Sequence, residues 1–477
     1  MTEDCCGTEE GNQGRYDLIV VGAGSAGFSA AITAAEQGKQ VALIGDGTIG
    51  GTCVNVGCVP SKTMIRAAET LHQAGAASRF SGIQSASAIV DWPALVAQKQ
   101  ELVNDLRQAK YADLLPAYNN VAYLQGRATV IDGGVMVDGS AIKAGRTIIA
   151  TGSSPSVPDI KGIEDVPYLT STTALELETL PVSMTVIGGG YIGCELAQMF
   201  ARAGVQVTIV FRSRLLPETE PEISDALTDY FIRENITVIG GVTYRQASRQ
   251  GDRIALDVVY GGNQDTIVSD HLLITSGRHA NSAGMGLEEA GIELAANGGI
   301  KIDDRMRTTV SGIYAAGDVT GRDQFVYMAA YGAKLAAKNA LNGDAERYDN
   351  RAMPAVVFTD PQLASVGLTE AQAREQGIDV KTSLLPLEHV PRALAARDTR
   401  GLIKLVADGA TDQLIGAHIL APEGADSIQT AALAIQQGMT VQALGDMIFP
   451  YLTTVEGLKL AAQTFDKDVA MLSCCAG

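Results

Sequence analysis

A strand–turn–helix–strand pattern occurs twice in this chain, and this repeat constrains the fold more than any other feature. In the first copy, an apolar strand begins at Tyr16 and enters a glycine-rich turn of the form G-x-G-x-x-G. The residues that follow predict an alanine-rich helix over Ser25–Gln37 and a second strand over Gln40–Ile44. Glycines in such a turn let the backbone approach a pyrophosphate group, which then lies at the helix N-terminus. The glycines of this turn are Gly22, Gly24 and Gly27.

The second copy begins at Met184 and repeats the same order of elements. A glycine turn follows the strand, a helix is predicted to run to about Ala203, and a second strand to cover Gln206–Phe211. Two copies in one chain indicate two dinucleotide sites, and the repeat is far more specific than one motif alone. The glycines of the second turn are Gly188, Gly190 and Gly193.

The residues that end the second strand of each copy predict a difference between the two sites. A carboxylate normally binds the ribose at this position, but the first copy has Gly45 there, with Asp46 next along the chain. The second copy has Arg212 and Arg214 instead. Two guanidinium groups suit a 2′-phosphate, because they can form bidentate hydrogen bonds with it. We therefore expect NADPH rather than NADH at the second site; a solvated basic turn is the alternative.

A segment rich in glycine carries two cysteines, Cys53 and Cys58, that are close enough in sequence to close a small disulfide ring. We expect Pro60 to be the first residue of a helix. Cys58 would then lie just before the helix N-terminus, where the dipole favours a thiolate, and Lys62 would reach back over the same face. The segment predicts two-electron thiol chemistry; two buried structural cysteines are the alternative.

Composition excludes several classes of partner. Of the 477 residues, 36 are Lys or Arg and 54 are Asp or Glu, which gives a net charge of −18. This acidic balance argues against nucleic acid or an anionic membrane surface as a partner. No apolar run is long enough to span a membrane, and the N-terminal segment lacks the hydrophobic part of a signal peptide. We therefore expect a cytoplasmic protein, in which seven cysteines indicate catalytic or metal-binding thiols.

The last part of the chain has a different pattern of predicted strands and helices and contains no third glycine turn. We interpret it as a separate α+β domain that follows a linker near Asn342–Asn350. The predicted strands are Val356–Phe358 and Gly401–Val406, and the predicted helices are Ser427–Gln437 and Val441–Met447.

Two further segments complete an ordered set of motifs. Ala150-Thr151-Gly152 lies between the two copies, and Ala315-Ala316-Gly317-Asp318 follows the second. With the glycine turns and the cysteine pair, they resemble the pyridine nucleotide–disulfide oxidoreductases, from about Tyr16 to the end of the chain. The resemblance implies an α/β fold with two Rossmann-like domains, for FAD and NADPH, and a C-terminal α+β dimerisation domain. The expected boundaries are a tail at 1–14, an FAD-binding domain at 15–153 and 282–345, an NADPH-binding domain at 154–281, and a dimerisation domain at 350–477.

The resemblance also implies roles for individual residues. Cys58 would be the thiolate against the flavin and Cys53 the exchanging thiol. Lys62 would lie near the flavin, paired with Glu195, and Tyr191 would guard the side on which NADPH delivers hydride. The other residues that it places at the cofactors are Gly22, Gly24, Gly27, Asp46, Gly47, Gly51, Thr52, Ala128, Thr151, Gly152, Asp318, Val326, Gly188, Gly190, Gly193, Arg212, Arg214 and Gly277.

One departure from the family pattern bears on the substrate. Disulfide-reducing members have a histidine–glutamate pair near the C-terminus; this chain keeps the glutamate, Glu456, but has Tyr451 in place of the histidine. The nearest of the five histidines, His418, is far away in the sequence. A phenol with a pKa of about 10 cannot serve as a base at neutral pH. A disulfide is therefore not the expected substrate.

The chain ends in Cys474-Cys475-Ala476-Gly477. Adjacent thiols form a strained disulfide but suit a soft, thiophilic metal ion. Together with Gln324–Tyr327 and Phe449–Thr453, this end resembles the members of the family that reduce mercury(II) to elemental mercury. The resemblance implies a homodimer with an active site shared between subunits. Cys474 and Cys475 would take Hg(II) from small-thiol complexes and pass it to the inner cysteine pair.

Four cysteines are thus the expected metal ligands, and two tyrosines would flank the bound ion. The cysteines are Cys53, Cys58, Cys474 and Cys475, and the tyrosines are Tyr191 and Tyr451. For Tyr191, shielding of the flavin alone is an equal alternative.

Two other functions remain open. A thioredoxin-reductase-like flavoprotein also relays electrons through adjacent C-terminal cysteines, although the missing histidine counts against it. A flavoprotein that only sequesters metal is the second, and the two intact nucleotide motifs count against that one.

Overall fold

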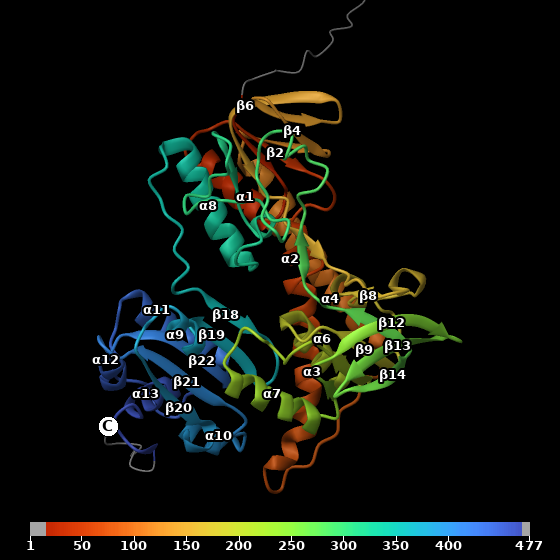
Figure 1. Cartoon of the computed structure of the whole chain (residues 1–477), viewed down its shortest axis with the longest axis vertical. Helices are drawn as coiled ribbons and strands as arrows, with labels where there is room; N and C mark the ends of the chain where they lie inside the picture. Colours follow the sequence, from red (N-terminus) through yellow and green to blue (C-terminus); the bar gives the residue numbers. More distant parts are fainter. Residues whose placement is uncertain (1–15, 470–477) are drawn as a thin grey trace, which may run out of the picture. The chain divides into compact units, whose positions relative to one another are not determined.

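The computed structural model describes residues 16–469 of the chain (Figure 1). Cys474, Cys475 and the Cys5–Cys6 pair lie outside the described residues. The chain divides into two compact units. Among the described residues, the first comprises 16–55, 103–154 and 279–348, and the second comprises 56–102, 155–278 and 349–469.

A seven-stranded sheet forms the core of the first unit. Its order is β3-β2-β1-β6-β5-β4, with β17 paired to β6. Strand β1 pairs in parallel with β2 and β6, whereas β4, β5 and the first half of β6 form an antiparallel meander. The strands are β1 (Tyr16–Val21), β2 (Val41–Gly45), β3 (Val121–Gln125), β4 (Ala128–Ile131), β5 (Gly134–Val137), β6 (Ser140–Ile149) and β17 (Ile313–Ala315).

Two helices of this unit pack against each other, α1 (Ser25–Ala35) and α8 (Val326–Asn342) (Figure 1). Alanines dominate the buried face of α1, and small side chains let the two helices approach closely. The parallel strands read as continuous apolar runs because both faces of this part of the sheet are covered. The short helix α2 (Gly51–Asn55) follows β2.

The second unit repeats the parallel arrangement in a five-stranded sheet of order β11-β10-β9-β15-β8. A separate antiparallel sheet, β12-β13-β14, belongs to the same unit. The strands are β8 (Leu169–Thr170), β9 (Ser183–Ile187), β10 (Gln206–Val210), β11 (Thr237–Ile239), β12 (Thr243–Gln250), β13 (Arg253–Tyr260), β14 (Asn263–Ser269) and β15 (His271–Ile274). The helices are α3 (Cys58–Gly75), α6 (Tyr191–Arg202) and α7 (Pro221–Arg233).

The C-terminal part of the second unit is a five-stranded antiparallel sheet with helices, as the sequence predicted. Its order is β18-β19-β22-β21-β20, and alternating apolar residues of the sheet and helices share one buried core. The strands are β18 (Pro354–Val357), β19 (Gln362–Gly367), β20 (Val380–Pro386), β21 (Leu402–Asp408) and β22 (Leu414–Ala421). The helices are α9 (Glu370–Glu375), α10 (Pro391–Ala396), α11 (Gly424–Gln436), α12 (Val441–Asp446) and α13 (Glu456–Gln463).

The predicted start of the helix after the cysteine segment was wrong by two residues. Helix α3 begins at Cys58 itself, with Gly57 as its N-cap, and Pro60 is its third residue. A proline is tolerated there because N–H groups of the first turn have no partner within the helix. The thiol of Cys58 is thus part of the helix N-terminus rather than preceding it.

No helix among residues 16–469 has the length and apolar character that crossing a membrane requires.

Candidate active site

The first glycine turn joins β1 to α1 and has no room for side chains. A Cβ atom added to Gly22 would lie 2.2 Å from the carbonyl oxygen of Ala150, and one added to Gly27 would lie 1.7 Å from that of Gly22. Gly22 also has a φ of 120°, which other residues rarely adopt. Backbone packing therefore explains these two glycines without reference to a ligand.

Gly24 has a different environment, which fits a phosphate. A Cβ atom there would meet only the Cα of Gly51, at 3.5 Å. Gly24 is the N-cap of α1, and no side chain of the described residues caps this helix. The N–H groups of its first turn are therefore oriented toward open space, which suits the pyrophosphate of a dinucleotide. These residues fit the cofactor that the sequence predicts.

The two short motifs between and after the copies meet at one edge of the first sheet. They follow β6 and β17, which are parallel neighbours with Ile149 opposite Ala315. Ser153 donates a hydrogen bond from its hydroxyl to a carboxylate oxygen of Asp318 at 2.7 Å. This contact was not anticipated, since nothing in the sequence links the two residues except the order of the strands.

The other residues expected at the first site are spread around this edge. Asp46, Gly47 and Thr52 are exposed, and Gly51 packs against Gly24. Thr151 exchanges hydrogen bonds with Asn281, at 2.7 and 3.0 Å. Ala128 is buried in β4, Val326 is the first residue of α8, and Gly152 has a φ of 73°.

The two cysteines of the glycine-rich segment are both half-buried. Cys53 lies in α2, and Cys58 begins α3. A division between the units falls between Asn55 and Val56, so each thiol belongs to its own unit. Cys194, by contrast, is fully buried in α6, where burial and then Glu195 raise the pKa of its thiol. This side chain packs in an apolar core cluster of the second unit.

An ion pair lies on α3 and α6, as the resemblance implied. The ammonium of Lys62 donates to one carboxylate oxygen of Glu195 at 2.7 Å, and the backbone N–H of Phe358 donates to the other at 2.9 Å. The ammonium also lies 5.0 Å from the centre of the Phe358 ring. Glu195 is 5% exposed and Lys62 is 32% exposed. No sequence motif points to Phe358, because it lies directly after β18 and is distant in sequence from Lys62 and Glu195.

The second glycine turn, between β9 and α6, repeats the geometry of the first. A Cβ atom on Gly188 or Gly193 would clash with a backbone oxygen, of Thr275 at 2.6 Å or of Gly188 at 2.0 Å. A Cβ atom on Gly190 would meet nothing within 4 Å, and α6 has no capping side chain among the described residues. This open helix N-terminus again fits a dinucleotide phosphate. Gly277 is equally open.

Tyr191 is the first residue of α6, directly after Gly190. Burial raises the pKa of its phenol, and the nearby carboxylate of Glu218 raises it further. The side chain therefore remains neutral at physiological pH.

The two arginines after β10 differ in their surroundings. Arg212 is exposed, and its guanidinium lies 5.9 Å from the centre of the Tyr244 ring. Arg214 donates to the carbonyl oxygens of Pro217 and Thr219, at 2.9 and 2.5 Å. One of its nitrogens is buried without a hydrogen-bond partner among residues 16–469. Arg212 is therefore available to a phosphate, whereas Arg214 also holds its own loop in place.

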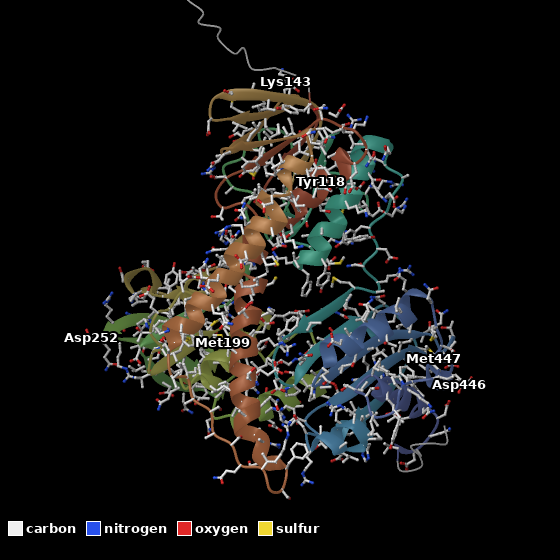
Figure 2. All side chains as sticks on the ribbon, turned by 180° about the vertical axis from the view of Figure 1, so that it is seen from behind. Tyr118, Lys143, Met199, Asp252, Asp446 and Met447 are labelled. Carbon is white, nitrogen blue, oxygen red and sulfur yellow. The ribbon has the colours of Figure 1, made fainter. Side chains whose placement is uncertain are left out.

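The loop between α12 and α13 carries Tyr451, where disulfide-reducing members have histidine. Tyr451 is 52% exposed, and Glu456, the first residue of α13, is buried and accepts a hydrogen bond from the backbone N–H of Leu452. Apolar residues of this loop are exposed, and Figure 2 labels Asp446 and Met447 at its start. They are Met447, Ile448, Tyr451 and Leu452.

Across residues 16–469, no three His, Cys, Asp or Glu side chains gather into a metal site.

Comparison with known proteins gives a consistent result. The pattern described as pyridine nucleotide-disulphide oxidoreductase matches residues 16–337, and that of the dimerisation domain of the same family matches residues 353–462. The mercuric reductases of Lysinibacillus sphaericus and Streptomyces lividans are each 47% identical to this chain. The matches cover 98% and 97% of this chain, and 85% and 98% of the relatives.

Similar solved structures include a HOCl-induced flavoprotein disulfide reductase, RclA from Escherichia coli, as its Cu(II) complex. It has a TM-score of 0.83 and 31% identity, and the match covers 94% of this chain and 99% of that one. LpdA from Mycobacterium tuberculosis has a TM-score of 0.83 and 27% identity, with 94% and 100% covered.

Proposed function

Because this chain belongs to the pyridine nucleotide-disulphide oxidoreductase family, we propose that it reduces mercury(II) to elemental mercury with NADPH, through FAD. The observation that carries this function is 47% identity to mercuric reductases over nearly the whole chain. The tyrosine at position 451 supports it independently, since a disulfide reductase needs a base at that place.

The overall reaction consumes one NADPH and one Hg(II), and yields NADP⁺, a proton and Hg(0). Bound FAD and NADPH supply the two-electron transfer, and the protein supplies binding, orientation and sulfur ligands. Thiolates are the side chains that a soft ion prefers. Each transfer of the ion between thiol pairs would keep it bound to sulfur.

In this proposal the first unit holds FAD. The N-terminus of α1 binds the pyrophosphate at Gly24, and Asp318 accepts hydrogen bonds from the ribityl hydroxyls. Ser153 supports that role, because its hydroxyl fixes the carboxylate of Asp318 at 2.7 Å. Gly22 and Gly27 would shape the turn that presents the N-terminus of α1. The other residues proposed to bind FAD are Asp46, Gly47, Gly51, Thr52, Ala128, Thr151, Gly152 and Val326.

The second unit holds NADPH at the N-terminus of α6. Gly190 leaves space for the pyrophosphate, and the exposed guanidinium of Arg212 pairs with the 2′-phosphate. Arg214 contributes positive charge while holding the loop. Gly277 and Tyr191 line the same site.

The cysteine pair would hold the metal ion, and the electrons that reduce it would come from the flavin. Cys58 begins an 18-residue helix, whose dipole favours its thiolate form. Lys62 adds positive charge on the next turn, and Glu195 fixes its position through the 2.7 Å ion pair. The sequence brings Cys53 within five residues of Cys58, and we propose that both thiols ligate Hg(II) while electrons reach it.

The match to the family's dimerisation domain supports a homodimer. We propose that the exposed apolar loop around Ile448 is buried in that dimer, because exposed apolar clusters mark interaction surfaces. The active site would then be shared, with Tyr451 reaching the ion bound in the other subunit. A cytoplasmic location stays a prediction.

The test compares substrates under one reductant. We expect NADPH oxidation to accelerate with HgCl2 in the presence of excess small thiol, and not with thioredoxin or a small aromatic disulfide. The opposite preference would establish the thioredoxin-reductase-like alternative. Binding of Hg(II) without steady-state NADPH turnover would indicate a sequestering protein.

The C-terminal cysteines provide a separate prediction about delivery. Changing Cys474 and Cys475 to alanine should leave reduction of FAD by NADPH intact, because neither thiol is among the residues proposed to bind the two nucleotides. Turnover of thiol-ligated Hg(II) should fall by roughly 10-fold or more, since one exchange step between thiol pairs is lost. Stopped-flow flavin reduction and steady-state turnover measure the two effects, and unchanged turnover in the double variant would refute the delivery role.

A further inference from the structure

The first dinucleotide site lacks the carboxylate that normally binds ribose, and the structure shows what lies there instead. The second strand ends at Gly45, which is buried, and Asp46 beyond it is exposed. A Cβ atom added to Gly45 would meet the phenol oxygen of Tyr123 at 2.7 Å and the Cβ of Ala23 at 2.8 Å. The φ of Gly45 lies outside the left-handed range, so it is this lack of space that excludes a side chain.

Strand register explains how Tyr123 reaches this place. In the parallel pair β2–β3, Tyr123 lies opposite Leu43 and Gln125 lies opposite Gly45. Side chains alternate along a strand, so Tyr123, Leu43 and Gly45 share one face of the sheet. This face is covered by α1, because a Cβ atom on Gly27 would contact Leu43. The long phenol leans along the strand until its hydroxyl reaches the end of β2.

The hydroxyl of Tyr123 is thus placed between the end of β2 and the glycine turn. Ala23, whose Cβ lies near the same point beside Gly45, is the second residue of that turn. Among residues 16–469, the Tyr123 hydroxyl forms no hydrogen bond, and its side chain is half-buried. Burial raises the pKa of this phenol, so it stays neutral at physiological pH and can both donate and accept a hydrogen bond.

We propose that the hydroxyl of Tyr123 binds the adenosine ribose of FAD, in the role that a carboxylate at position 45 would otherwise have. The phenol comes from the third strand and reaches a ribose hydroxyl because Gly45 leaves the space. The two positions therefore depend on each other. The phenol of Tyr123 fits only because residue 45 has no side chain, and glycine at position 45 leaves the ribose to the phenol. The proposal rests on FAD occupying the first unit, and it is independent of the metal substrate.

The first experiment measures the affinity of the apoprotein for FAD by flavin fluorescence, without NADPH or mercury. Tyr123→Phe keeps the ring and removes the hydroxyl, so the Kd for FAD should rise roughly 3- to 10-fold, the value of one hydrogen bond. Tyr118→Phe is the matched control, because Tyr118 (labelled in Figure 2) lies at the turn before β3 and is not among the nearest neighbours of a Cβ atom on Gly45. The Kd of this control for FAD should equal that of wild type.

A cofactor analogue separates ligand binding from packing. An FAD whose adenosine lacks the 2′-hydroxyl should bind wild type several-fold more weakly than FAD does. It should bind Tyr123→Phe about as well as FAD does, because the partner of the missing group is already gone. If Tyr123→Phe still bound FAD more tightly than the analogue by the same factor as wild type, the Tyr123 hydroxyl would not be the ribose ligand. The same conclusion would follow if Asp46→Asn, and not Tyr123→Phe, abolished the discrimination.

A pair of variants tests the dependence of the two residues on each other. Gly45→Glu should weaken FAD binding more than Tyr123→Phe does, because the new side chain collides with the phenol. Adding Tyr123→Ala and Ala23→Gly to Gly45→Glu removes both side chains that the new Cβ atom would meet and supplies a carboxylate, so affinity should return to within about 3-fold of wild type. Wild-type affinity in Gly45→Glu alone, or no recovery in a triple variant with wild-type circular dichroism, would overturn the proposal.

Discussion

The two glycine turns are nearly identical in backbone and different in what surrounds them. Gly22 and Gly188 have φ values of 120° and 118°, and the caps Gly24 and Gly190 have ψ values of −168° and −172°. In each turn, the last glycine packs against the carbonyl of the first. The shared pattern therefore specifies one backbone, which directs a helix N-terminus at a phosphate.

The difference lies where the second strand ends. In the first unit, a small residue there, Gly45, leaves room for Tyr123 from the third strand. In the second unit, Phe211 fills the corresponding space, and a Cβ atom on Gly189 would meet its ring at 2.9 Å. The two arginines follow directly after Phe211. We therefore expect the glycine pattern to determine where a dinucleotide binds, and the residues at the strand ends to determine which dinucleotide it is.

The largest effect should come from filling the closely packed glycine of either turn. Gly27→Ala should weaken FAD binding roughly 100-fold, because the methyl group would overlap a backbone oxygen. Gly193→Ala should leave FAD bound and weaken NADPH binding to a similar extent. Titration calorimetry with each cofactor measures both.

Matched controls exist in each unit for that pair. A Cβ atom on Gly145 would come no closer than 4.0 Å to the backbone of Asp17, and one on Gly75 would meet nothing within 4 Å. Alanine at either position should leave both affinities unchanged. If Gly27→Ala and Gly193→Ala impaired the two cofactors equally, the turns would not serve separate sites.

A smaller effect should separate the two arginines of the second unit. Arg212→Ala should raise the KM for NADPH roughly 10- to 100-fold and leave the KM for NADH unchanged, because it removes a charged hydrogen bond to the 2′-phosphate. Arg214→Ala should also lower the melting temperature by a few degrees, since its bonds to Pro217 and Thr219 are lost.

Steady-state kinetics with both nucleotides and thermal unfolding distinguish these outcomes. Equal loss of activity with NADPH and with NADH in Arg212→Ala would show that this residue does not bind the 2′-phosphate.

The smallest effect should come from changing the residue that follows the second glycine of a turn. This residue is Ser25 in the first turn and Tyr191 in the second, and only the tyrosine can titrate. Burial raises the pKa of Tyr191, so the folded protein holds the phenol proton more tightly than the unfolded chain. The associated stability is present below the unfolded pKa of about 10 and is lost as the pH rises toward the folded pKa.

Tyr191→Phe should therefore match wild type at neutral pH and lose less thermal stability between about pH 9 and about pH 11. Unfolding curves over this range measure the difference. Parallel loss in both proteins would mean that the phenol does not titrate with folding.

Local patterns predicted the architecture well. The two glycine turns, their flanking strands and helices, and the C-terminal sheet follow from periodicity and from glycine chemistry, which act over short stretches. The pairing of Lys62 with Glu195 came from family resemblance and is confirmed by the 2.7 Å contact.

Contacts between distant segments could not be predicted in the same way. Phe358, Ser153 and Tyr123 reach their places through sheet order and register, which no local pattern reports. The start of α3 was misplaced because proline is tolerated at several positions of a first turn. The sequence predicts the same phosphate-binding role for Arg212 and Arg214. The hydrogen bonds from Arg214 to two carbonyl oxygens of its own loop distinguish them, and no local pattern predicts these bonds.

The most direct test of the proposed activity is to collect the metal product. Purified protein with FAD, NADPH, HgCl2 and excess thiol should release volatile mercury, trapped and quantified by atomic absorption, in an amount equal to the NADPH oxidised. Oxidation of NADPH without release of Hg(0) would contradict the proposed function, whatever the two nucleotide sites bind.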